Sequence, residues 1–193
     1  MTLAFTMKRS EFLRSTAGWA CGACLAAVMG GPAAEAAELP TPVDEALKRA
    51  RYENEFTNNW LTDLFEAIDT ELGWADQMKL LDACGRGCFR RHAFKRDIAA
   101  AGKGDLEKLI EAYRRSFSVR RSGDELHIVY GGGKCFCPAA RNRPARPNDL
   151  HCECTRATHR AIFEEALGRR FEIELVETVR RGGSCCHLIV ALA

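Results

Sequence analysis

The chain has 193 residues, with 28 lysines and arginines against 26 aspartates and glutamates, which gives a formal net charge of +2. This length suits one domain with a core of its own, and such a core needs no obligatory cross-links. The nearly balanced charge argues against a nucleic-acid-binding protein, which would need a strongly basic face.

The first 36 residues have the features of an export signal. Lys8, Arg9 and Arg14 make a basic start, an Ala- and Gly-rich apolar run follows over 17–31, and Ala34-Glu35-Ala36 offers small residues at the two positions that a signal peptidase reads. The string from Lys8 to Arg14 resembles a twin-arginine signal with Ser10 in place of the second arginine. We predict cleavage after Ala36 and an exported, periplasmic protein. The apolar run is short for a bilayer span, so no stable membrane insertion is expected.

Helical signals fill the first half of the remaining chain, residues 37–193. Thr41-Pro42 is typical of an N-cap followed by proline at the first helical position, and apolar residues then recur every three or four positions as far as Ile68. Gly73 is expected to end this helix. Three more helices are predicted, with Gly85-Arg86-Gly87 separating the first two: about 74–83, 88–101 and 106–115.

The second half has mainly strand signals. Apolar and polar residues alternate over 126–130, 171–175 and 186–192, and one further helix is predicted over 155–167. Gly131-Gly132-Gly133 and Gly182-Gly183 mark turns. The order predicts an α+β fold in which a helical N-terminal half packs on a mainly antiparallel sheet with one crossing helix.

Eight cysteines fall in the predicted domain, and each lies close to another in the sequence. Paired cysteines in an exported chain normally form disulfides. Cysteines that are adjacent or one residue apart cannot easily reach the Cα separation of about 5.5 Å that a relaxed disulfide needs. Two thiolates on one tight loop are typical of a tetrahedral metal site or an iron–sulfur cluster. The spacing therefore favours zinc, or alternatively an iron–sulfur cluster, over four disulfides between pairs. The pairs are Cys84 with Cys88, Cys135 with Cys137, Cys152 with Cys154, and Cys185 with Cys186.

The predicted metal ligands are ranked by their place in the chain. Cys135, Cys137, Cys152 and Cys154 come first, because they bracket an arginine-rich loop and would fix its two ends together. Cys84 and Cys88 are expected to open a helix, where the helix dipole lowers a thiol pKa, and they would complete the site or act in redox chemistry. A further ligand is Cys186, which strand alternation places on the same side as Leu188. Additional candidates are His151 and His187, because each stands next to a cysteine. The other three histidines are expected on the surface or on a strand face: His92, His127 and His159.

Arginines and aromatic residues predict a binding pocket. Arg141 and Arg143 lie in the Pro-punctuated loop between cysteine pairs and could clamp an anion, although a solvated basic loop is the plainer interpretation. The first helix carries large apolar residues, among them Phe56 and Trp60, opposite strands with short or β-branched side chains. Core packing would use these aromatics, but we predict an apolar pocket between the helices and the last two strands, with Trp60 in it and Arg86 at its edge.

Several motifs resemble a known family. They are Cys135-Phe136-Cys137-Pro138, Cys152-Glu153-Cys154, the helix end over 163–168, and the ending over 182–189. With these motifs the stretch from about 130 to 192 resembles the 4-vinyl-reductase-type small-molecule-binding domain, and residues 80–88 resemble a motif of cysteine-rich relatives of unknown function. The resemblance implies the fold of nitric-oxide-sensing and vesicle-tethering domains, with an apolar pocket between helices and sheet. It implies no haem, because no histidine matches a proximal ligand.

Three functional hypotheses follow. The first is an exported, metal-stabilised domain that binds or senses a small, largely apolar ligand with an anionic group. The second is an enzyme, either a hydrolase or a thiol-redox protein, that uses a cysteine thiolate or a metal-bound water; no particular catalytic residue stands out. The third is a structural protein held by disulfides. A closed four-cysteine site would be structural, whereas three ligands plus water would be catalytic. A homodimer is compatible with each hypothesis.

Overall fold

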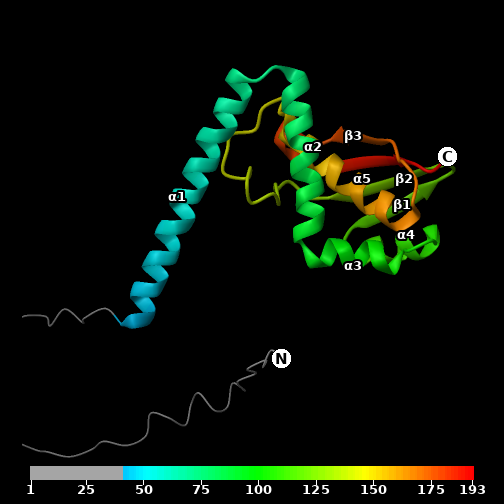
Figure 1. The fold of residues 1–193 in the computed structure, drawn as a ribbon, viewed down its shortest axis with the longest axis horizontal. Coiled ribbons are helices and arrows are strands. Elements are labelled where there is room, and N and C mark those ends of the chain that lie inside the picture. Colours follow the sequence, from blue (N-terminus) through cyan, green and yellow to red (C-terminus); the bar gives the residue numbers. More distant parts are fainter. Residues whose placement is uncertain (1–40) are drawn as a thin grey trace, which may run out of the picture. The chain divides into compact units, whose positions relative to one another are not determined.

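The computed structural model describes residues 41–193, and the predicted signal peptide, residues 1–36, lies outside the described residues. Helices fill the first half of the described part and strands dominate the second, which confirms the α+β class (Figure 1). The elements are α1 (Pro42–Glu71), α2 (Trp74–Arg91), α3 (Ala93–Ala101), α4 (Leu106–Arg114), β1 (Ser118–Ser122), β2 (Glu125–Tyr130), the 3-10 turn η2 (Leu150–Cys152), α5 (Glu153–Leu167), β3 (Ile173–Glu177), the 3-10 turn η3 (Val179–Arg181) and β4 (Cys186–Ala191).

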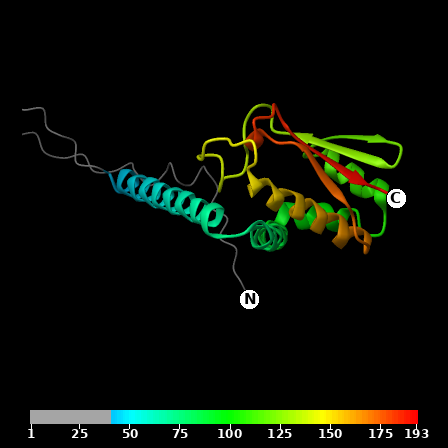
Figure 2. The same cartoon turned by 90° about the horizontal axis from the view of Figure 1, so that it is seen from above.

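The four strands form one antiparallel sheet in the order β1-β2-β4-β3. Helices cover one face of this sheet, with α5 crossing it (Figure 2). Leu126 and Ile128 on β2, and Leu188 and Val190 on β4, point into this side and are fully buried. Alternation along each strand explains why the sequence predicts β2 and β4 well, since one face is buried and the other is not.

The core between sheet and helices is filled. Tyr113 from α4 and Phe163 from α5 are fully buried against the strands, and their rings lie 5.2 Å apart. These two aromatic side chains complement the short and β-branched residues of the sheet. The predicted apolar pocket between the helices and the last two strands is therefore wrong, because the partners of the sheet come from α4 and α5 and not from α1.

The predicted helix break at Gly85-Arg86-Gly87 in α2 is wrong. The helix runs through these residues without interruption and ends only before His92. A Cβ on Gly85 would lie 2.3 Å from the carbonyl oxygen of Cys154 and 2.6 Å from the Cβ of Ala157. Gly85 is thus required where α2 and α5 approach each other closely, and it is not a helix end.

α1 begins as its sequence predicts. Thr41 caps it in a capping box with Asp44, and Pro42 takes the first helical position. Phe56 and Trp60, however, are 61% and 56% exposed, and α1 has one buried residue, Ile68. The predicted roles of these aromatics in a core or a pocket are therefore wrong.

Candidate metal centre

The eight described cysteines are free thiols, and they come from four separate parts of the fold. Two lie on α2, two in the loop 131–149 after β2, two at the junction of η2 and α5, and two at the start of β4. Cys84 and Cys88 belong to the second half of α2, so the prediction that they open a helix is wrong, and the N-terminal dipole does not act on them.

One group of cysteines lies where α2 meets α5. Gly85 admits the first turn of α5, and the Thr158 hydroxyl donates to the carbonyl oxygen of Gly85 at 3.1 Å. Cys154 is half-buried at this contact. Burial, followed by the charges of Cys88, Cys84 and Cys137, raises the pKa of Cys154 to about 12. We call Cys84, Cys88, Cys137 and Cys154 the α2-side thiols.

Cys137 joins this group from the loop. Burial raises the pKa of its thiol, and the charges of Cys135 and Cys88 raise it further. Its Sγ lies 3.2 Å from Nε2 of His151. His151 is buried, and burial lowers its pKa, so its imidazole is neutral near pH 7. The other ring nitrogen, Nδ1, is buried with no hydrogen-bond partner within the described residues.

A second group lies nearer the sheet. The Cys152 thiol donates to the Thr178 hydroxyl at 3.3 Å. Burial, with smaller contributions from the charges of Asp149 and Cys186, raises the pKa of Cys152 to about 12. Burial also raises the pKa of Cys186, and the charge of Cys135 raises it further. We call Cys135, Cys152 and Cys186 the sheet-side thiols. Burial raises the pKa of the Tyr130 hydroxyl, and the charges of all three thiols and of Cys137 raise it further.

The charge contributions connect all seven predicted cysteine ligands, and they do not separate the four that ranked first. Cys137 links the two named groups, because the charge of Cys135 raises its pKa more than that of Cys88 does. That Cys135, Cys137, Cys152 and Cys154 share one metal stays a prediction. Cys186 faces this region as strand alternation predicts. His187 does not, because its ring stacks on His127 with Nε2 and Nδ1 3.0 Å apart, on neighbouring strands.

Burial favours the neutral thiol at Cys137, Cys152, Cys154 and Cys186, whereas Nζ of Lys95 already donates to Sγ of Cys88 at 2.8 Å. Near pH 7 a thiol with a raised pKa keeps its proton, and several thiolates close together repel one another. A soft cation reverses both effects, and thiolate with neutral imidazole is a donor set that zinc and iron–sulfur clusters use. In the conformation described, no three histidine, cysteine, aspartate or glutamate side chains within residues 41–193 converge closely enough to hold a metal ion.

A buried arginine holds the loop between the cysteine pairs. Arg180 on η3 donates from Nε to Asp149 at 3.0 Å and from Nη1 to the carbonyl oxygen of Ala140 at 3.0 Å, and both charged side chains are almost fully buried. Its remaining donors bind the carbonyl oxygens of Arg143 and Pro144. One side chain thus fixes most of the loop against the sheet.

The predicted anion-binding arginines have different surroundings. Arg143 is buried, pairs with Asp69 of α1 at 2.8 Å and lies 5.0 Å from the ring centroid of Phe65. Its role is to join the loop to the end of α1, whose Phe65 ring also packs edge-on against His151. Arg141 lines an open hollow of about 380 Å³ beside Cys135.

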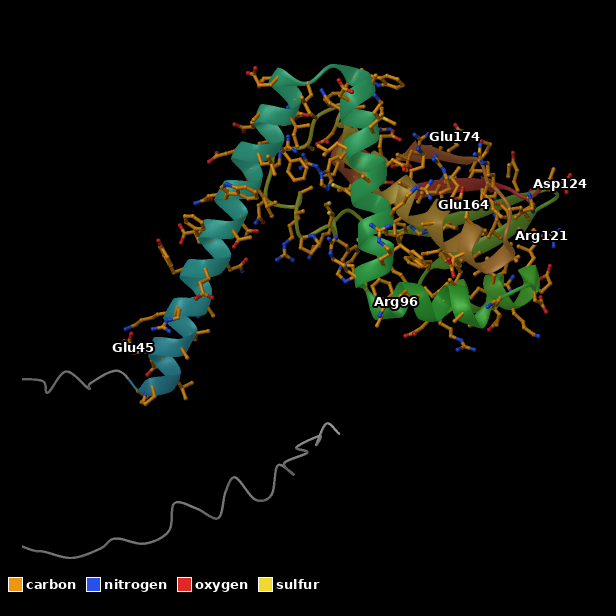
Figure 3. The ribbon with its side chains drawn as sticks, in the orientation of Figure 1. Glu45, Arg96, Arg121, Asp124, Glu164 and Glu174 are labelled. Atoms are coloured by element: carbon orange, nitrogen blue, oxygen red, sulfur yellow. The ribbon has the colours of Figure 1, made fainter. Side chains whose placement is uncertain are left out.

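Arg86 and Trp60 lie outside this region. Arg86 pairs with Asp82 at 2.8 Å and with Glu164 of α5 at 3.1 Å, so its charge is matched (Figure 3 labels Glu164). It lines a wider charged hollow over α2 and α5. Trp60 stands exposed on α1 and lines none of these hollows.

His159 is buried in the domain, although its sequence position suggested the surface. It lies on α5 and is buried among Tyr113, Phe117 and Tyr130, with its Nδ1 3.1 Å from the Tyr113 hydroxyl. Burial lowers the pKa of His159 to about 3. The prediction of a surface position is wrong, and the i, i+4 relation of His159 to the apolar Phe163 on the same helix was the available signal.

No family model and no curated protein matches this chain. The resemblance to the 4-vinyl-reductase-type domain therefore stays a prediction. Among the helices within residues 41–193, none combines the length and the apolar character needed to cross a membrane.

Proposed function

We propose that this chain is a soft-metal-binding domain in which Cys88, Cys137 and Cys154 hold zinc or an iron–sulfur cluster, with Cys84 as fourth ligand. One observation carries the proposal: thiols from α2, the loop and α5 lie close enough together that the charges of Cys88, Cys84 and Cys137 add to the effect of burial on the pKa of Cys154. His151 is the alternative to Cys84 as fourth ligand, because its ring contacts Cys137 and its Nδ1 is buried without a hydrogen-bond partner within residues 41–193.

The residues have separate tasks in this proposal. A bound cation would supply the positive charge that allows the thiols to ionise. Gly85 sets the approach of Cys154 to α2, and the contact of Cys137 with His151 holds the loop thiol near them. Rotation of the cysteine side chains and closure of the loop complete the ligand set. Such a site with four protein ligands is closed and structural.

The test is the metal content of protein purified under reducing conditions, measured by elemental analysis together with a free-thiol count. We expect about one zinc or one cluster per chain, since this is the stoichiometry of a four-cysteine centre. Cys88→Ser and Cys154→Ser should each lose it, because a hydroxyl does not replace a thiolate on a soft metal. Cys185→Ser is the matched control, since that thiol contacts Glu177 at 3.7 Å and belongs to neither group.

A second measurement follows from the pKa values. Each ligating thiol must lose its proton, so adding zinc to the metal-free protein in weak buffer should release about three to four protons. Metal retained in Cys154→Ser but lost in Cys185→Ser would refute the ligand assignment. Metal-free protein whose mass shows that the eight described cysteines have lost their thiol hydrogens would replace the metal centre with four disulfides.

We also propose that the domain acts outside the cytoplasm, on the strength of the basic start, apolar run and Ala-x-Ala sequence within residues 1–36. A fusion of residues 7–36 to a reporter that is active only after export should be active. Equal reporter activity from a fusion that lacks these residues would refute export.

Binding of a small anion is a second candidate function. The hollow of about 380 Å³ beside Cys135 is edged by Lys134 and Arg141, and neither makes an ion pair within residues 41–193. We expect sulfate or a small carboxylate to raise the melting temperature of the protein, and Arg141→Ala to remove that increase. Arg120→Ala, an exposed change on β1, is the control. An increase that survives Arg141→Ala would reflect a general salt effect and would refute the site.

A further inference from the structure

α1 carries a row of large apolar side chains that nothing within residues 41–193 covers. Tyr52, Phe56 and Trp60 are 67%, 61% and 56% exposed. Phe65 lies nine residues after Phe56, which at about 100° per residue is half a turn away, and it packs against the rest of the domain. The exposed row therefore occupies the side of α1 that faces away from the domain.

The residues of this row are arranged symmetrically about Phe56. Tyr52 and Trp60 lie four positions before and after it, and Arg49 and Asp63 lie seven positions before and after it. Both spacings return to the same side of an α-helix. We call Arg49, Tyr52, Phe56, Trp60 and Asp63 the outer stripe. Read in reverse, the stripe keeps its spacing and exchanges a positive end for a negative one.

The charges at the two ends of the outer stripe are unused. The ion pairs of α1 are Lys48 with Glu45 and those that Asp69 makes with the loop. Arg49 and Asp63 thus remain without an ion-pair partner within residues 41–193. An arginine and an aspartate at equal distances from a central aromatic residue match each other when two such helices lie antiparallel.

We propose that two copies of this chain associate through α1, antiparallel, with Phe56 at the two-fold axis. Phe56 then packs on its equivalent, Tyr52 on Trp60 of the other copy, and Arg49 pairs with Asp63 of the other copy. Closed two-fold interfaces require a patch that is complementary to itself. The outer stripe meets that requirement in the spacing of its aromatic residues and in the opposite charges at its two ends.

Two further features favour a second copy. Every residue from 42 to 57 is exposed, and a helix with so little packing is marginal in water unless a partner covers one side. Figures 1 and 3 show this first half of α1, with Glu45 labelled, standing clear of the sheet and of α2 to α5. A membrane surface is a poorer partner, because Glu53 and Glu55 border the stripe where lysine and arginine would be needed to meet acidic headgroups.

The test uses charge reversal and sedimentation equilibrium of the full chain under reducing conditions. Arg49→Asp alone sets aspartate against Asp63 twice in each dimer, and Asp63→Arg alone sets arginine against Arg49 twice. We expect each single variant to raise the dissociation constant of the dimer about tenfold or more. An equimolar mixture of the two variants restores both attractive contacts in the heterodimer, so it should dimerise as tightly as the original chain.

Arg51→Asp is the matched control, since Arg51 is exposed and lies five residues before Phe56, about 140° around α1 from the stripe, and this change should leave the dissociation constant unchanged. Phe56→Asp should give a monomer. A monomeric original chain would overturn the proposal, and so would single reversals that have no effect, which is the result expected for parallel helices. Metal content should be the same in all these variants, so the outcome is independent of the metal centre.

Discussion

Replacing Gly85 with alanine tests how closely α2 and α5 must approach. The new Cβ would lie 2.3 Å from the carbonyl oxygen of Cys154, 2.6 Å from the Cβ of Ala157 and 2.9 Å from the amide nitrogen of Thr158. Two of these three neighbours are backbone atoms, which cannot rotate aside. The helices must therefore separate by roughly 1 Å to restore ordinary contact distances near 3.4 Å or more.

Two opposing effects set the size of the change. Alanine is favoured over glycine inside a helix by about 0.8–1 kcal/mol. Overpacking of a close helix contact costs about 1–3 kcal/mol, and more where backbone must move. We expect a net loss of about 1–2 kcal/mol in the free energy of unfolding. For a domain of this size that corresponds to a melting temperature lower by about 2–8 °C.

Gly87→Ala is the matched control in the same helix. A Cβ at Gly87 would meet mainly the guanidinium end of Arg91, at 2.8 Å, which can rotate away. Gly87→Ala should therefore leave stability unchanged or raise it by up to about 1 kcal/mol. Denaturant unfolding of both variants checks this. A Gly85→Ala variant as stable as the original chain would refute the close approach of α2 and α5.

Three further predictions concern charge and metal. Arg180→Met leaves Asp149 buried without its partner and should cost about 3–5 kcal/mol in denaturant unfolding, against less than about 0.5 kcal/mol for exposed Arg115→Met. Burial keeps the pKa of His159 near 3, below the usual 6.5, so the unfolded chain binds more protons than the folded chain between pH 3 and 6.5. The free energy of unfolding should therefore fall as the pH drops through this range, by up to about 1.4 kcal/mol per pH unit. His159→Gln should flatten this dependence of stability on pH, and an unchanged slope would refute the assignment to His159. Removal of metal with a chelator should speed amide hydrogen exchange in the loop 131–149 and leave β2 and β4 protected, whereas loss of protection in both strands would contradict a metal centre outside the core.

Burial on one face explains which strands the sequence predicts. β2 and β4 alternate because their inward residues are buried, whereas β1 presents serines and arginines with one half-buried residue, Val119. β1 exists through its pairing with β2 across a turn at Gly123, whose φ is +58°. Alternation could not reveal β1, and a glycine turn next to an already predicted strand was the only local signal.

The sequence alone does not decide the structural role of a glycine inside a helix or the packing partner of an aromatic residue. A glycine inside a helical pattern marks either an end or a close approach, and only the position of Cys154 on α5 decides for Gly85. Periodicity predicts that α1 is a helix, but it carries no information on what an apolar face packs against. The aromatic residues of α1 are therefore expected at a pocket against the sheet, in a space that side chains of α4 and α5 fill.

The division of the cysteine pairs has a geometric cause. Cys152 and Cys154 stand at the start of a helix, where residues two positions apart point about 200° apart, so one faces Thr178 and the other faces α2. Sequence proximity alone therefore does not tell which thiols of neighbouring pairs face each other.

The placement of the thiols bears on what they do for the protein. Disulfide- or metal-dependent small domains use their cross-links because they lack a sufficient core. This domain has a continuous core of α3, α4, α5 and the sheet. Of the eight described cysteines only Cys152 is buried, and none belongs to that core. The α2-side thiols lie instead where α2, the loop and the first turn of α5 meet, while Arg180 and Arg143 fix the loop to η3 and to α1. Cysteines in such a place lie outside the apolar core, which supports the proposal that they hold a metal.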